Sequence, residues 1–182
     1  MKVIVAQTAA SGAIYTRQII ELLLQSPQVS QIALVRSRSA EAVAKYEGVA
    51  LPCSDRIVEY APDDMFAPVA SGSARYSAMI IAPASAGTMG RIAAGVSDSL
   101  ITRAADVMLK ERRALVLLLR ETPLSLIHLQ NMVTLTQAGA VIMPASPSFY
   151  NGEQTIEQLT ENLCRRVVDI AGIECERCEW GV

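Results

Sequence analysis

The stretch that decides the fold runs from Ser77 to Met132 and reads SAMIIAPASAGTMGRIAAGVSDSLITRAADVMLKERRALVLLLRETPLSLIHLQNM. It contains two short apolar runs, Ala78–Ala82 and Ala114–Leu119. Each run is soon followed by polar residues, the first by Ser85–Thr88 and the second by Arg120-Glu121. Open α/β sheets bind their ligands just beyond the carboxyl ends of their strands. The two endings therefore predict a ligand site, and their residue types favour a phosphorylated ligand.

Apolar runs and helical patterns alternate along the whole chain, with no hairpin signal between them. This alternation predicts a parallel sheet covered by helices on both faces. We expect strands at Lys2–Gln7, Gln31–Val35, Ala78–Ala82, Ala114–Leu119 and Ala140–Met143. We expect helices at Ala13–Gln25, Ser39–Tyr46, Thr88–Gly95, Ser99–Lys110, Pro123–Gln137 and Thr155–Ala171. Asp98 and Thr122 are the expected N-caps of the fourth and fifth helices.

The segment Leu51–Ser73 contains Pro52, Pro62 and Pro68, and it predicts a long irregular excursion. Long loops in compact domains are often functional.

Composition narrows the class of protein. The 182 residues fit one domain, 1–182, of which 51% are hydrophobic and only 4% aromatic. This apolar content fits either a rich core or burial in an oligomer interface, and we favour the interface. The net charge of -2 gives no basic footprint for nucleic acid. No apolar stretch is long enough to cross a membrane, and Met1-Lys2 leads directly into a strand, so we expect neither a membrane span nor a signal peptide.

The four cysteines are predicted to be reduced thiols rather than a disulfide framework. Cys175 and Cys178 have the CxxC spacing of a metal clip or a redox pair. A structural zinc site needs four ligands, whereas His128 is the only histidine and there is no second CxxC. We therefore expect no metal site, and we favour a C-terminal segment in which Cys175 and Cys178 have no metal-binding or redox role.

Small and hydroxyl-bearing residues follow three of the expected strands. The loop Thr8–Ala13 follows the first strand, Ser37 the second and Ser85–Thr88 the third. Backbone N–H groups at a helix start hold phosphates well, and small residues allow a close approach. Such residues are also ordinary helix caps, but three of them at strand ends favour a ligand.

Charged residues near the last strands allow two interpretations. Arg103 and Lys110 are seven positions apart on one helix and so share a face to within about 20°. They form either a cationic wall for a phosphate or a solvated face paired with Asp106. Arg120 emerges from a buried strand end and should have a partner. Glu121 beside it is a candidate general acid or base, unless it merely pairs with another charge.

Five segments together resemble the flavin prenyltransferase family, the UbiX-like proteins. They are ASGAIY at 10–15, ASGS at 70–73, TRAADVMLKERR at 102–113, RETPLSLIHLQNM at 120–132 and GAVIMPASPSFY at 139–150. The resemblance covers nearly the whole chain, in the same order. It implies a three-layer Rossmann-like, flavodoxin-like α/β fold with a mostly parallel sheet, assembled as a cytoplasmic homododecamer.

The resemblance also implies a reaction. Family members join a dimethylallyl group from dimethylallyl monophosphate to N5 and C6 of FMN, without a metal. The prenylated FMN then serves a UbiD-type decarboxylase. The reacting nucleophile belongs to the flavin, so the protein mainly binds and orients the reactants.

Matching positions carry the family's site onto this chain. The residues matching the FMN site are Ala9, Ala10, Ser11, Ser37, Ser85, Ala86, Gly87, Thr88 and Arg120. The residues matching the allyl-phosphate site are Ser71, Arg103, Lys110, Tyr150 and Arg166. The acidic residues that match positions near the flavin and the leaving phosphate are Glu47 and Glu121. We expect catalytic roles for Glu121, Lys110, Arg103 and Glu47.

Two positions depart from the family pattern. Ala9 stands where a glycine is usual, and Met65 stands at or near a position that is often aromatic. These changes keep two alternatives open. One is an FMN-binding carrier without prenyl transfer. The other is an oxidoreductase like the flavin-dependent cysteine decarboxylases, favoured by the motif at Pro83–Thr88 but opposed by the lack of a histidine after an early strand. The prenyl donor, monophosphate or pyrophosphate, is also left open.

Overall fold

The computed structural model describes residues 1–150, 152 and 155–175. Its centre is a six-stranded sheet in the order β3-β2-β1-β4-β5-β6, and every neighbouring pair is parallel. The strands are β1 (Lys2–Gln7), β2 (Gln31–Arg36), β3 (Ile57–Tyr60), β4 (Ala78–Ala84), β5 (Ala114–Leu119) and β6 (Val141–Pro144).

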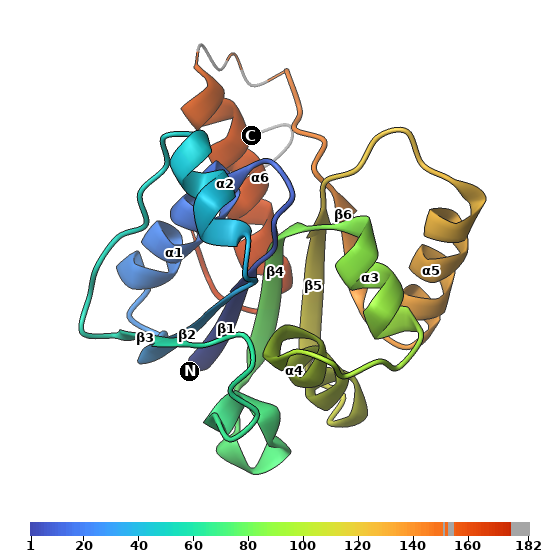
Figure 1. The fold of residues 1–182 in the computed structure, drawn as a ribbon. Helices are drawn as coiled ribbons and strands as arrows, with labels where there is room; N and C mark the ends of the chain where they lie inside the picture. The colour runs from blue at the N-terminus through green and yellow to red at the C-terminus, as the bar shows by residue number, and fades with distance from the viewer. Residues whose placement is uncertain (151, 153–154, 176–182) are drawn as a thin grey trace.

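Helices cover both faces of this sheet (Figure 1). They are α1 (Ala13–Gln25), α2 (Ala40–Tyr46), α3 (Ala86–Ala93), α4 (Leu100–Lys110), α5 (Leu126–Gln137) and α6 (Ile156–Ile170). Helices α1 and α6 pack on one face, and α3, α4 and α5 pack on the other. The expected three-layer, flavodoxin-like α/β fold is confirmed.

Alternation within the apolar strands explains why the sheet is buried on both sides. In β4, Met79 and Ile81 belong to the core beneath α3 and α4, whereas Ile80 and Ala82 belong to the core beneath α1 and α6. All four side chains are fully buried. A strand that is apolar at every position is typical of such a parallel sheet.

The segment 51–73 is less irregular than its prolines suggest. It contains the edge strand Ile57–Tyr60, which pairs with β2, and a short 3-10 helix at Pro68–Ala70. A second 3-10 helix, Gly72–Ala74, begins inside the segment and continues beyond it. The prediction of a wholly irregular excursion is therefore wrong. The strand has only four residues and one partner, so its sequence signal is weak.

Two expected helix caps are also wrong. The fifth helix begins at Leu126 rather than Pro123, because Ser125 and His128 cap it reciprocally. The fourth helix is capped by Ser99 and not by Asp98, since the Ser99 side chain accepts from the Thr102 N–H. His128 is thus a capping residue at the start of α5.

The strand order reverses next to β1, which has β2 on one side and β4 on the other. The carboxyl ends of these strands meet at the upper edge of the sheet in Figure 1. Ligands of doubly wound folds bind at such a switch point. Within the described residues, no helix is long and apolar enough to cross a membrane.

Candidate functional site

A cavity of about 400 Å³ opens at the switch point. The ends of β1, β2 and β4 form its floor, and the first residues of α2, α3 and α4 form much of its wall. Its lining residues are Thr8, Ala9, Ser37, Arg38, Ser39, Pro62, Asp63, Ser85, Thr88, Arg91, Asp98, Ser99 and Ile101. The volume falls in the range of small-molecule sites.

The structure brings together several residues of the expected FMN site. Ala9, Ser37, Ser85 and Thr88 line the cavity, although they come from three different strand ends. Ala86 and Gly87 belong to the first turn of α3 beside them. Ala10 and Ser11 are not among the lining residues. Arg120 lies at the end of β5, and its Nε donates to the Ser11 carbonyl at 3.2 Å.

Ser37 supplies the clearest sign that the cavity suits a ligand. Its Oγ is buried yet has no hydrogen-bond partner within the described structure. A buried hydroxyl without a partner costs free energy, so native proteins rarely keep one without a reason. Because Ser37 lines the cavity, a ligand oxygen placed there would satisfy it.

Three helix starts add positive potential to the same cavity. Ser39, Ser85 and Ser99 are the N-caps of α2, α3 and α4, and all three line the wall. The N-terminus of a helix carries roughly half a positive charge and exposes N–H donors. Together with the hydroxyl of Ser37, this donor set fits an anionic, oxygen-rich group such as a phosphate.

Thr8 begins the expected loop Thr8–Ala13, but the sequence assigns no role to its side chain. Its buried hydroxyl donates to the Pro83 carbonyl at 2.7 Å and accepts from the Ser85 N–H at 3.0 Å. One side chain therefore joins the carboxyl ends of β1 and β4. The sequence shows only that Thr8 follows the strand β1. It does not show that the ends of β1 and β4 are neighbours, because that depends on the order of strands in the sheet.

Glu47 occupies the start of α1, where the sequence predicts a phosphate loop. Its carboxylate accepts from the Gly12 N–H at 2.9 Å and from the Ala13 N–H at 2.7 Å. Burial alone would raise the pKa of Glu47. Hydrogen bonds from Ser11, Gly12 and Ala13, with the nearby Arg120, lower that pKa below its ordinary value. The anion at this helix start belongs to the protein itself.

Three residues of the expected allyl-phosphate site lie on or beside α4. The Nε of Arg103 donates to the Ala70 carbonyl at 3.1 Å, and its Nη1 pairs with Asp106 at 2.9 Å. Lys110 ends α4 and pairs with Glu111 at 2.8 Å. Ser71 follows Ala70 in the chain, so the Arg103 contact brings it close to α4.

The other two residues of that site lie elsewhere in the chain. Arg166 belongs to α6, on the opposite face of the sheet from α4, where it pairs with Asp169 at 2.8 Å. Tyr150 follows β6 and is 68% exposed. Within one chain, Arg166 therefore does not lie near Arg103 and Lys110.

Glu121 follows β5, and its carboxylate accepts from the neighbouring Thr122 N–H.

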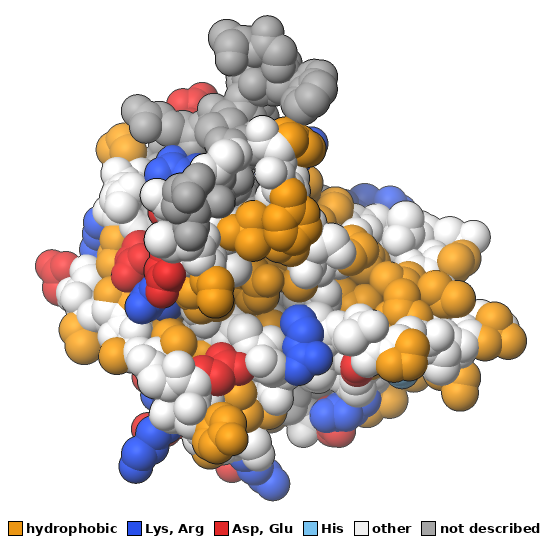
Figure 2. Space-filling model, turned by 90° about the horizontal axis from the view of Figure 1, so that it is seen from above, with side chains coloured by type: hydrophobic (Ala, Val, Ile, Leu, Met, Phe, Trp, Pro, Cys, Tyr) orange, Lys and Arg blue, Asp and Glu red, His pale blue; other side chains and the backbone are white. Residues whose placement is uncertain are grey.

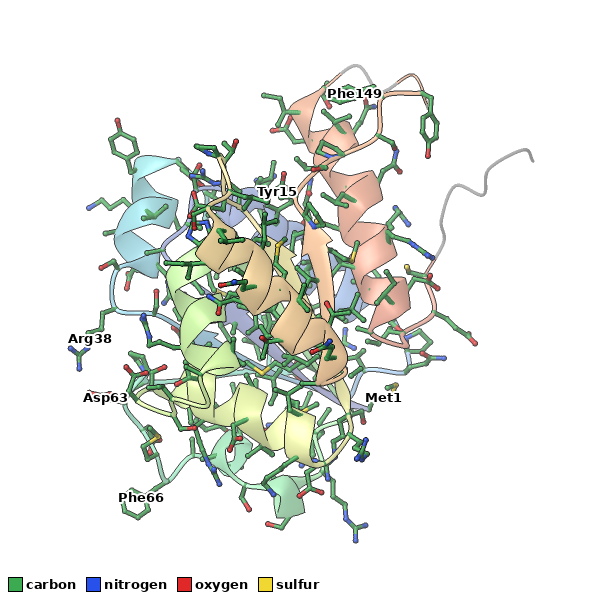
Figure 3. All side chains as sticks on the ribbon, turned by 90° about the vertical axis from the view of Figure 1, so that its right-hand side faces the viewer. Met1, Tyr15, Arg38, Asp63, Phe66 and Phe149 are labelled. Carbon is green, nitrogen blue, oxygen red and sulfur yellow. The ribbon has the colours of Figure 1, made fainter. Side chains whose placement is uncertain are left out.

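The segment before Ser71 presents apolar side chains to the exterior. Phe66 is fully exposed and points away from the body (Figure 3), and Met65 is 40% exposed. Of the CxxC pair, Cys175 donates through its Sγ to the Arg165 carbonyl at 3.3 Å, whereas Cys178 lies outside the described residues. The described part of the chain has no group of three or more His, Cys, Asp or Glu that could hold a metal.

A parallel sheet with a cavity of helix starts and hydroxyl groups at its switch point is the arrangement typical of nucleotide-binding α/β proteins. A family model described as Flavoprotein matches residues 1–168, and the chain belongs to that family. The flavin prenyltransferase UbiX of Methanocaldococcus jannaschii is 39% identical, over 96% of this chain and 95% of that protein. UbiX of Pseudomonas aeruginosa is 38% identical, over 99% and 94%. Within the flavoproteins, the chain is therefore a member of the UbiX-like flavin prenyltransferases.

Solved structures agree with this assignment. AnUbiX in complex with FMN and dimethylallyl pyrophosphate has a TM-score of 0.89 and 42% identity, over 98% of this chain and 97% of that one. A dodecameric FMN-dependent UbiX-like decarboxylase from Escherichia coli O157:H7 has a TM-score of 0.91 and 38% identity, over both full chains. A PPC decarboxylase mutant is only 17% identical, at a TM-score of 0.67, and shares the fold alone.

Proposed function

We propose that this protein joins a dimethylallyl group, taken from dimethylallyl monophosphate, to N5 and C6 of reduced FMN. The prenylated FMN would then pass to a UbiD-type decarboxylase in the cytoplasm. The observation that carries the proposal is the cavity at the switch point, which is lined by the unpartnered Ser37 hydroxyl and by three helix starts. Membership of the UbiX-like family supports the same reaction.

The residues of the cavity would hold the flavin mononucleotide. Ser37, Ser85 and Thr88 offer hydroxyls, and Ala9 keeps the end of β1 small enough for a close approach. The loop after β4 also contains Ala86 and Gly87, and the loop after β1 contains Ala10 and Ser11. Arg120 holds the loop after β1 through its hydrogen bond to the Ser11 carbonyl. Reduced flavin, when bound, supplies the nucleophilic atoms.

The cationic residues would bind the allyl phosphate and stabilise the charge that develops on it. Preorganised donors at a departing anion commonly contribute 10²–10³-fold, roughly, to the rate. We assign this role to Arg103, Lys110 and Arg166, with the hydroxyls of Ser71 and Tyr150. Glu121 would protonate the departing phosphate. Glu47 would hold the start of α1 beside the flavin, through its bonds to Gly12 and Ala13.

This assignment requires more than one copy of the chain. Arg103 and Lys110 lie on one face of the sheet and Arg166 on the other, so a site containing all three combines residues of neighbouring subunits. A homo-oligomer, a dodecamer like the E. coli relative, meets this requirement. Apolar side chains also gather over α5 on the right of Figure 2. They include the exposed Leu126, Ile127, Leu129 and Val133.

Two positions favour a second candidate, an FMN carrier without prenyl transfer. Ala9 lines the cavity with a methyl group, at a position where the family resemblance implies a glycine. Met65 offers no aromatic face to a dimethylallyl cation, which such a face would stabilise. Phe66 beside it points to the exterior within a single chain.

One experiment separates these candidates. The purified protein is incubated anaerobically with reduced FMN and dimethylallyl monophosphate, and the extracted flavin is analysed by mass spectrometry. A gain of one C5 prenyl unit is the expected result. Bound but unmodified FMN, with both the monophosphate and the pyrophosphate, would establish the carrier. No bound flavin at all would contradict the assigned cavity.

A further inference from the structure

Arg91 lies at the rim of the cavity, yet neither the family resemblance nor the sequence pattern gave it a role. It follows Gly87 by four residues on α3, and its Nη1 donates to the Gly87 carbonyl at 3.2 Å. The side chain is therefore folded back toward the start of the helix, beside Ser85 and Thr88. About half of it, 49%, is exposed.

Its ion pair in this structure is a loose one. The Nε of Arg91 lies 3.6 Å from Oδ1 of Asp98, and both side chains are about half exposed. Exposed pairs of this kind contribute little to stability. The same Asp98 oxygen accepts a hydrogen bond from the Thr102 hydroxyl at 3.3 Å. The same hydroxyl lies within reach of the Ser99 carbonyl at 3.0 Å, so Asp98 and that carbonyl share its proton when Arg91 moves away.

The charges around the cavity make such a move useful. The charged lining residues are two arginines, Arg38 and Arg91, and two aspartates, Asp63 and Asp98, so their formal charges cancel. Arg38 and Asp63 extend from the same side of the molecule in Figure 3. A phosphate monoester carries nearly two negative charges at pH 7. If Arg91 leaves Asp98, its charge adds to the three helix starts that face the phosphate.

We propose that Arg91 is a further FMN-binding residue, which exchanges Asp98 for the phosphate of the flavin. The inference rests on the proposed function, because it requires FMN in this cavity. A guanidinium binds a phosphate through two parallel hydrogen bonds, which are stronger than a loose contact with one carboxylate oxygen. Asp98 and the phosphate then compete for the Arg91 guanidinium, which stays paired with Asp98 until FMN binds.

The test compares FMN with riboflavin, which differs only in lacking the phosphate. The wild type, Arg91→Ala, Arg91→Lys and Asp98→Asn are titrated with each flavin in turn, with flavin fluorescence as the readout. Arg91→Ala should weaken FMN binding about tenfold and leave riboflavin binding within about twofold. Arg91→Lys should retain part of the FMN affinity. Asp98→Asn should strengthen FMN binding about two- to threefold, since the competing charge is removed.

Arg17→Ala is the matched control. Arg17 is a helical arginine in an equally loose ion pair, 3.9 Å from Glu21, but it lies on α1 and not in the cavity. It should leave both affinities unchanged. Equal loss of FMN and riboflavin binding in Arg91→Ala, or no loss of either, would overturn the role of Arg91 while leaving the proposed function intact. If the wild type binds riboflavin as tightly as FMN, the phosphate site is overturned. If it binds neither, the proposed function itself fails.

Discussion

Oε1 of Glu47 lies 2.9 Å from the backbone nitrogen of Gly12, so the C-cap residue of α2 caps the start of α1. The second carboxylate oxygen accepts from the Ala13 N–H. Helix α1 has no side-chain cap of its own, because its N-cap residue is Gly12. The carboxylate therefore supplies, from 35 positions away, the acceptor that a local serine or aspartate provides elsewhere.

Glu47→Gln should lower the stability of the protein by about 1 kcal/mol at pH 7, as the loss of a charged cap does. The folded-state pKa of Glu47 lies below its ordinary value of 4.5. Its stabilisation is therefore complete above about pH 4.5 and disappears as the pH falls through the folded-state pKa. Urea unfolding of both proteins, at one protein concentration, should give curves that converge in acid. A difference that stays constant with pH would contradict the charged cap.

Ser37→Ala should have opposite effects on stability and on flavin binding. Without FMN the variant loses a buried hydroxyl that has no partner, so it should be as stable as the wild type or more stable by about 1 kcal/mol. With FMN it lacks a donor and should bind more weakly, by about five- to tenfold. Thermal unfolding with and without FMN measures both effects. A loss of stability without FMN would show that Ser37 has a structural role instead.

Lys110→Ala should abolish prenyl transfer and spare FMN binding. Lys110 ends α4, whereas the cavity is lined by residues at the start of that helix, Ser99 and Ile101. We expect the rate to fall at least about 100-fold, as for the loss of one preorganised charge, with the FMN affinity within twofold. The control is Lys45→Ala on α2, which should leave both unchanged. An equal loss of FMN binding and transfer would place Lys110 in the flavin site.

Regular apolar patterns predicted most of the fold. The periodic residues of Ala13–Gln25, closed by Pro27, give α1 its observed bounds. Strand β3 was missed because Ile57–Tyr60 is short, pairs only with β2 and lies among prolines. Thr122-Pro123 has the residue types of a helix start and predicts α5 too early, because the reciprocal bonds of Ser125 and His128 place the start at Leu126.

The cavity could be predicted in part for a similar reason. Ser37, Ser85 and Thr88 follow buried strands, and parallel strands bring their carboxyl ends to one edge. The role of the Thr8 hydroxyl depends on which strands are neighbours, and that of Arg91 on how its side chain folds back along α3, so no local pattern predicts either. The occupation of the α1 start by Glu47 is a contact between distant positions that no local pattern records.

The positions of Lys110 and Arg166 lead to a test of the shared site. If the two residues meet only between neighbouring copies, Lys110→Ala and Arg166→Ala chains can complement each other. In a mixed oligomer, a site that takes α4 from an Arg166→Ala chain and α6 from a Lys110→Ala chain is intact. Each variant alone should be inactive. Random mixing of equal amounts should restore prenyl transfer to about a quarter of the wild-type rate, since one combination in four is intact.

Co-expression of the two variants with different affinity tags, followed by selection for both tags, gives the mixed oligomers. Prenylated FMN is then measured by mass spectrometry. The matched control mixes Lys110→Ala with Arg103→Ala chains. Both substitutions lie on α4, so no mixture contains a complete copy of that helix and activity should stay absent. If neither mixture is active, Arg166 and Lys110 do not meet between neighbouring copies. Opposite faces of the sheet also separate the two residues within one chain, so this result would show that they do not share a site.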